Sequence, residues 1–229
     1  MSTVEIVTPA MREELKRCFT IGVFIQANPY NWDEGENLPK NVTSKFKLSL
    51  FWINVFISSA CAMFSIFRCG QIFFDDLSPF WLKMYMPFSC VVITAVPIFY
   101  LVTAYNRREF LGFMRRLTRF LELYAVTHTP ADCSVRENLT RLVPISIRFL
   151  RLAVATNCTV YTLNAVFRPD SPEFILSICP QGNYYYLARI IHYIVLVVYV
   201  TVHRSVVTLV LSSFFFFTCP MFIVLEEIR

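Results

Sequence analysis

The apolar stretch at residues 184–225 constrains this chain more than any other part of its sequence. Its only formally charged residues are Arg189 and Arg204, and Val, Ile, Leu, Phe and Tyr dominate the rest. As one continuous helix the stretch would be about 63 Å long, twice the roughly 30 Å of a hydrocarbon core. A single membrane crossing therefore cannot use all of it.

Two arrangements fit this length. Two spans would have to reverse at His203-Arg204, which lacks the Gly, Pro or Asn of a good helical hairpin. We therefore expect one very long helix that crosses at residues 184–202 and continues as an apolar helical extension over residues 205–225. A fifth span at 205–225 is the alternative. In either arrangement Pro220 is expected to kink or stop the helix.

Three more runs are long and apolar enough to cross a bilayer, at residues 48–67, 84–105 and 149–167. The chain is therefore expected to be an all-α integral membrane protein with four transmembrane helices. Arg151 lies near the start of the third run and is expected to snorkel to the interface. Despite the net charge of +5, no nucleic-acid partner is expected, because the basic residues gather in segments between the apolar runs.

The distribution of Lys and Arg predicts the orientation. The segment before the first span has six of them and residues 106–148 have eight, whereas the two other loops have two and one. The positive-inside rule then places the N-terminus and the loop at 106–148 in the cytoplasm, in a multi-pass protein of the cell membrane. That loop begins with an amphipathic pattern, which we interpret as an extension of the second span with a solvated basic face. Binding of this face to anionic membrane lipid is the alternative.

The sequence offers little chemistry. No nucleophile, zinc-protease or phosphate-loop motif is present, so neither an enzyme nor a cofactor is expected. His192 and His203 would lie about 16 Å apart along one helix, too far to share a metal ion. Of the eight cysteines, Cys69 and Cys179 fall in or beside the two short outer loops, so we consider a disulfide between them.

Several local patterns resemble the insect odorant receptor family, and together they cover nearly the whole chain. Residues 15–22 are similar to its N-terminal amphipathic segment, which ends in a glycine. Residues 107–111 are similar to the charged continuation of its second helix. The prolines at 169 and 172 and Cys179-Pro180 precede Tyr184 and a very long fourth helix, as in the family. The predicted topology is also the one of this family, and it is inverted relative to G-protein-coupled receptors.

The resemblance implies a subunit of an odorant-gated cation channel that acts in the sense of smell. Members have seven spans and form hetero-tetramers with a shared odorant co-receptor subunit. This chain would be the N-terminal four-span portion of such a truncated seven-helix receptor, without the pore helix, and is expected to pass no current. Gustatory receptors share the layout and are one alternative. A four-span scaffold protein is another, although both outer loops are short for that class.

If the chain is such a receptor, a small volatile organic ligand is expected to bind among the second, third and fourth spans. Helical spacing and depth nominate the lining residues. They are Met84, Phe88 and Val91 in the second span, Thr159, Thr162 and Val166 in the third, and Tyr186, Ile190, Tyr193 and Val197 in the fourth.

Overall fold

The computed structural model describes residues 6–127, 134–172, 174–179, 182 and 184–228. Six α-helices account for most of this chain: α1 (Pro9–Thr20), α2 (Lys45–Phe74), α3 (Phe80–Tyr105), α4 (Arg107–Thr127), α5 (Ser134–Phe167) and α6 (Tyr185–Ile228). Two short 3₁₀ helices, η1 (Val23–Ile25) and η2 (Ile175–Ile178), lie in the connections. Helices α2, α3, α5 and α6 are each long and apolar enough to cross a membrane.

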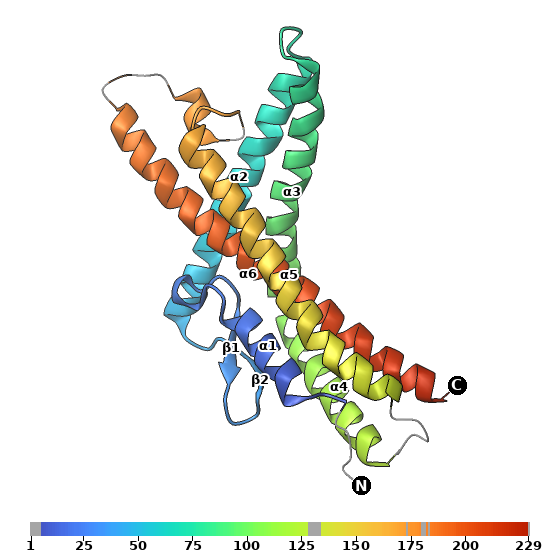
Figure 1. Cartoon of the computed structure of the whole chain (residues 1–229). Helices are drawn as coiled ribbons and strands as arrows, with labels where there is room; N and C mark the ends of the chain where they lie inside the picture. Colours follow the sequence, from blue (N-terminus) through green and yellow to red (C-terminus); the bar gives the residue numbers. More distant parts are fainter. Residues whose placement is uncertain (1–5, 128–133, 173, 180–181, 183, 229) are drawn as a thin grey trace.

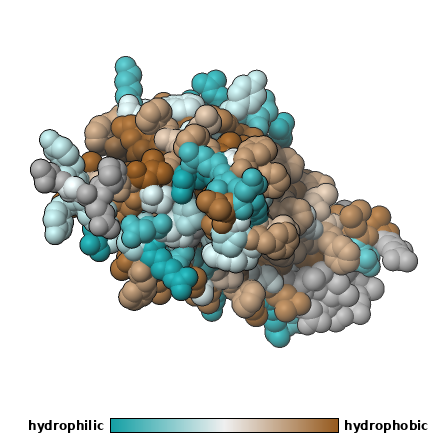
Figure 2. All heavy atoms as spheres, turned by 90° about the horizontal axis from the view of Figure 1, so that it is seen from above, coloured by the Kyte–Doolittle hydropathy of each residue, from teal (hydrophilic) through white to brown (hydrophobic). Residues whose placement is uncertain are grey.

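The four spans form two pairs that cross in the middle of the molecule. Helix α2 packs along α3, and α5 packs along α6, so that the pairs diverge toward the upper ends (Figure 1). Many large apolar side chains on these helices are exposed, and hydrophobic residues cover much of the surface seen from above (Figure 2). Exposure of this kind is expected where lipid replaces water as the surroundings.

Helix α6 is continuous from Tyr185 to Ile228, about 66 Å at 1.5 Å per residue. The prediction of one long helix without a reversal at His203-Arg204 is therefore confirmed. Pro220 was expected to kink or stop the helix, and it does not stop it, because the helix runs two more turns beyond this residue. Pro220 is buried, so it lies in a packed part of the helix although the proline removes one backbone hydrogen bond.

The region between the second and third spans is more helical than expected. After a break at Asn106 the chain continues as α4, which bears out helical structure directly after the second span. Helix α5 begins at Ser134, well before the predicted span start at residue 149. The reason is tertiary packing, because Val143 and Ile147 are buried in the hydrophobic core with α1.

The N-terminal segment folds into a small unit that the spacing of apolar runs did not reveal. Thr8 caps α1 by accepting a hydrogen bond from the Met11 amide, and Pro9 occupies a first-turn position where its missing amide hydrogen costs nothing. Strands β1 (Tyr30–Asp33) and β2 (Leu38–Asn41) then form an antiparallel hairpin. This hairpin departs from the all-α prediction, and its signal was the turn-forming sequence that follows Asp33.

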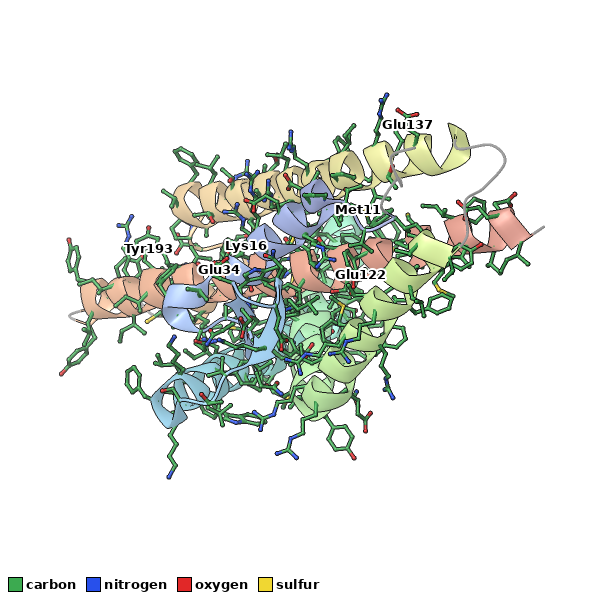
Figure 3. All side chains as sticks on the ribbon, turned by 90° about the horizontal axis from the view of Figure 1, so that it is seen from below. Met11, Lys16, Glu34, Glu122, Glu137 and Tyr193 are labelled. Atoms are coloured by element: carbon green, nitrogen blue, oxygen red, sulfur yellow. The ribbon has the colours of Figure 1, made fainter. Side chains whose placement is uncertain are left out.

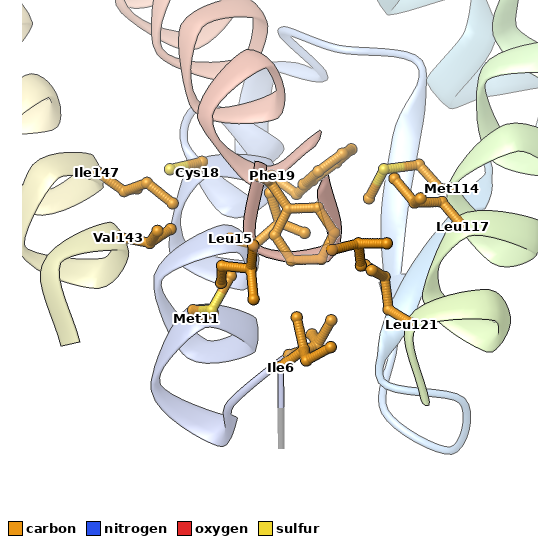
Figure 4. Close-up of a cluster of buried hydrophobic side chains, with 14 of the residues drawn as sticks. Ile6, Met11, Leu15, Cys18, Phe19, Met114, Leu117, Leu121, Val143 and Ile147 are labelled. Carbon is orange, nitrogen blue, oxygen red and sulfur yellow. The ribbon is translucent and has the colours of Figure 1, made fainter. Parts of the chain in front are cut away.

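Helix α1 lies between α4 and α5 and shares one hydrophobic core with both. In Figure 4, Val143 and Ile147 of α5 approach it from one side, and Met114, Leu117 and Leu121 of α4 from the other. The hairpin is held to its neighbours by ion pairs, including Lys16 to Glu34 at 2.8 Å, whose labels lie together in Figure 3. Arg115 of α4 pairs with Glu36 in the turn of the hairpin, and a separate pair joins Arg12 of α1 to Glu122 of α4.

The connection from α1 to β1 enters the helix bundle. Gln26, Ala27 and Asn28 are all buried. Side chains of three spans donate hydrogen bonds to backbone carbonyls of this connection. The hydrogen bonds are Asn54 Nδ2 of α2 to the Ile25 carbonyl (2.6 Å), the Tyr100 hydroxyl of α3 to the Ala27 carbonyl, and Ser205 Oγ of α6 to the Ile21 carbonyl (2.9 Å). Some polar residues of the spans thus donate hydrogen bonds to the backbone of this connection rather than to a neighbouring span.

Candidate functional site

A cavity of about 210 Å³ lies among α3, α5 and α6, the three spans between which the sequence predicts a ligand site. Aromatic rings form much of its wall. They come from Tyr85 and Phe88 on α3, Tyr161 on α5, and Tyr199 and His203 on α6. The rings of Tyr161 and Tyr199 lie 6.3 Å apart between centroids, and those of Tyr199 and His203 lie 6.1 Å apart. The cavity therefore presents polarizable faces to whatever fills it.

Two buried polar atoms, on side chains that line this cavity, have no hydrogen-bond partner in the described chain. They are the Tyr199 hydroxyl, on a residue only 6% exposed, and Nδ1 of His203. A buried polar atom left unpaired costs about 1–3 kcal/mol. A ligand with one hydrogen-bonding group would remove that cost, and the same applies to a bound water.

A smaller cavity of about 30 Å³ continues the first one toward η2. Ile93, Tyr161 and Tyr199 line both, so the two cavities are neighbours across these side chains. The smaller one also meets Phe174 and His192, whose rings are 5.6 Å apart. Nε2 of His192 is another buried nitrogen without a hydrogen-bond partner within the described residues.

Of the ten nominated residues, Phe88 is the one that lines the larger cavity. Thr159 and Thr162 lie instead in a groove on another side of α5. Tyr193 packs beside His192, with Arg189 over its ring. The other six are exposed on the outside of the bundle: Met84, Val91, Val166, Tyr186, Ile190 and Val197.

Most of the nominated residues lie on helix faces that point away from the cavity. Those on α6 also lie closer to the outer end of that helix than the cavity does. Helical spacing groups residues onto one face but does not say which face meets the neighbouring helix. A better signal was present in the sequence, because polar residues inside apolar spans tend to face the bundle interior. Tyr199, His203 and Ser89 follow that rule and line the cavity.

The disulfide considered between Cys69 and Cys179 is absent from the structure, in which both are free cysteines. Cys69 lies instead against Cys90 of the adjacent helix α3, since α2 and α3 pack side by side. Throughout the described ranges, no three His, Cys, Asp or Glu side chains gather closely enough to hold a metal ion.

A cluster of charges joins α1 to α5 at the end of the bundle where α1 lies. Glu14 is 3% exposed, and its Oε1 accepts hydrogen bonds from Arg17 (3.1 Å) and Arg148 (3.1 Å). Arg151, 17% exposed, places a guanidinium nitrogen 3.1 Å from Oε2. The guanidinium that was expected to snorkel to the interface thus pairs with the buried carboxylate of Glu14.

The neighbouring Cys18 is fully buried and donates a hydrogen bond from its thiol to the Ser212 hydroxyl, at 3.2 Å. Burial raises the pKa of the Cys18 thiol, which keeps the group neutral within the core that α1 shares with α6.

A comparison with known protein families, curated proteins and solved structures finds no match to this chain.

Proposed function

We propose that this chain is the ligand-binding part of an odorant receptor subunit, which lies in the cell membrane with its N-terminus in the cytoplasm. One observation carries the proposal: aromatic side chains line the cavity among α3, α5 and α6, and two of them, Tyr199 and His203, carry a polar atom without a hydrogen-bond partner within the described residues. Pockets of this composition, apolar with a few convergent polar groups, are typical of small-molecule sites.

The ligand is a small, mostly apolar molecule that carries one oxygen function. The cavity is below the roughly 300–1,000 Å³ of pockets for drug-sized compounds, which favours a ligand of the size of a volatile organic compound. A ketone, ester or alcohol oxygen would accept a hydrogen bond from the Tyr199 hydroxyl. An alcohol would also donate to His203 when its Nδ1 is unprotonated. A hydrocarbon of the same size would leave both groups unpaired and should bind more weakly.

Features elsewhere in the chain are compatible with the resemblance to insect odorant receptors. Amphipathic α1 is followed by Gly22 in the left-handed conformation, α4 continues directly after α3, and α6 is 44 residues long. The basic residues of α4 and of the start of α2 lie at the same end of the bundle as α1, as a cytoplasmic N-terminus requires (Figure 1). In this proposal the partner is an odorant co-receptor subunit, and the full-length form is a hetero-tetramer.

Replacing Tyr199 with phenylalanine is expected to weaken binding of an oxygenated ligand and to leave its hydrocarbon analogue unaffected. Loss of one hydrogen bond predicts about fivefold lower affinity for 2-octanone and no loss for octane. The measurement is displacement of the fluorescent apolar probe N-phenyl-1-naphthylamine from the purified chain in nanodiscs. Ser89→Phe places a large side chain in the cavity, so the part of the probe signal that this variant loses is the part that comes from this site.

Tyr186→Phe is the matched control, because it removes the same hydroxyl from an exposed position of the same helix. It should bind both compounds like the unchanged chain. Equal effects of the two tyrosine substitutions would place ligand binding elsewhere. Saturable competition by sugars and other polar solutes would favour the gustatory alternative. A signal that Ser89→Phe does not reduce would contradict the receptor proposal and leave a membrane scaffold as the better reading.

A further inference from the structure

A groove lies on the α5–α6 pair, and Cys158 and Val200 separate it from the aromatic cavity, because they line both. This groove of about 460 Å³ is bounded by Gly22 and Phe24 near one end, and among the described residues that line it Arg204 of α6 is the only charged one. Its walls include Ala155, Thr159 and Leu163 of α5. The groove therefore combines a long uncharged surface with a single cation.

The walls of the groove are less polar than their threonines imply. Each of the three threonine hydroxyls in it donates a hydrogen bond to the backbone carbonyl four residues earlier on its own helix. The bonds are Thr159 to Ala155 (2.9 Å), Thr162 to Cys158 (2.8 Å) and Thr201 to Val197 (2.8 Å). Since the donors are already used within the helices, the groove suits a hydrocarbon chain better than a polar solute.

A second group of charges lies on α1 and α5, and its net charge is positive. Arg151 lies one helical turn before Ala155 and hence on the same side of α5 as the groove. It belongs to the charge cluster in which the carboxylates of Glu13 and Glu14 meet the guanidinium groups of Arg17, Arg148 and Arg151. This cluster holds three cations and two anions, so it carries one uncompensated positive charge, and Arg204 carries another. Arg204 is exposed and has no ion pair within the described residues.

The depth of these arginines matches the headgroup level of a bilayer. Beyond Arg151, α5 carries no charge until it ends at Phe167, a length of about 24 Å. On α6 the residues from 190 to 203 are likewise without formal charge apart from the titratable histidines. The arginines thus lie where hydrocarbon gives way to headgroups, and the groove runs from them into the hydrocarbon layer.

We propose that this groove binds one anionic phospholipid from the leaflet on the α1 side, with its phosphate at Arg204 and an acyl chain between α5 and α6. Charge complementarity favours this occupant, because a guanidinium pairs strongly with phosphate and the uncompensated charge selects a headgroup of net negative charge. The lipid would fill the space beside Gly22, where the connection after α1 meets α6.

The test is native mass spectrometry of the purified full chain in detergent, with phosphatidylglycerol and phosphatidylcholine of identical acyl chains. The unchanged protein should bind phosphatidylglycerol more tightly. Arg204→Gln should weaken phosphatidylglycerol binding about tenfold, the loss expected for a charge-assisted hydrogen bond. Thr159→Phe keeps the charge but fills an exposed part of the groove, and should weaken binding of both lipids at this site.

Arg116→Gln is the matched control, because it removes an exposed arginine of α4 that lies outside the groove. It should change lipid affinity by less than about twofold. Equal losses for Arg116→Gln and Arg204→Gln would mean diffuse electrostatic attraction and would overturn the proposal. So would equal affinity for the two lipids, or a Thr159→Phe variant with unchanged binding. Displacement of the lipid by glycerol 3-phosphate would show a site for free phosphate and would also overturn it.

Discussion

Substitution of Glu14 by glutamine is expected to release α1 from the helix bundle. The buried carboxylate is the counter-charge for Arg17, Arg148 and Arg151, and glutamine keeps its size but not its charge. Loss of one partner of a buried ion pair costs about 3–5 kcal/mol. Since the Arg17 and Arg148 side chains are half-exposed and water screens them, we expect about 2–3 kcal/mol here.

The measurement is hydrogen exchange of the α1 amides in the purified protein, with the amides of α2 as an internal reference. Glu13→Gln is the matched control at the adjacent position, because Glu13 is half-exposed and, within the described part of the chain, pairs with Arg17 alone. It should cost less than about 0.5 kcal/mol. Similar protection of α1 in the two variants would show that the apolar contacts of Met11, Leu15 and Phe19 hold the helix without help from the charges.

The membrane-spanning part of the fold could be predicted because each span satisfies its own backbone hydrogen bonds. Length and apolar content are then enough to find α2, α3 and α6 to within a few residues at most ends. The start of α5 could not be found in this way. Residues 134–148 are too polar for a span, and they are helical where Val143 and Ile147 meet α1, a contact between segments far apart in the sequence.

The candidate sites were harder to predict than the spans. The sequence indicated the three helices that enclose the cavity, but not how each is rotated about its axis. Rotation is set by interhelical packing, such as the approach of Tyr199 to Tyr161. The arginine cluster could not be predicted from the sequence for a related reason. Glu14 and Arg148 are neighbours only because α1 inserts beside α5, so the buried carboxylate had no visible partner beyond its own helix.

Replacement of Gly22 by alanine is expected to be the most damaging small substitution in the chain. Gly22 has φ +70°, a left-handed conformation that costs an alanine about 1–2 kcal/mol. An added Cβ would also lie 2.6 Å from Cβ of Ala27 and 3.3 Å from Cγ2 of Thr201. Overpacking of a tight site adds about 1–3 kcal/mol. At a total cost of about 2–5 kcal/mol, we expect the buried connection between α1 and β1, which Asn54, Tyr100 and Ser205 hold by hydrogen bonds, to be displaced.

Two companion variants separate the causes of this loss. Gly70→Ala places a Cβ in open space within α2 and should leave stability unchanged or raise it by up to about 1 kcal/mol. The double variant Gly22→Ala/Ala27→Gly removes the closest contact, so it should recover the steric part and keep the conformational part. Unfolding by denaturing detergent, followed by far-ultraviolet circular dichroism, measures all three. A double variant as unstable as Gly22→Ala would show that the collision with Ala27 contributes little, and would leave backbone conformation and the contact with Thr201 as the causes.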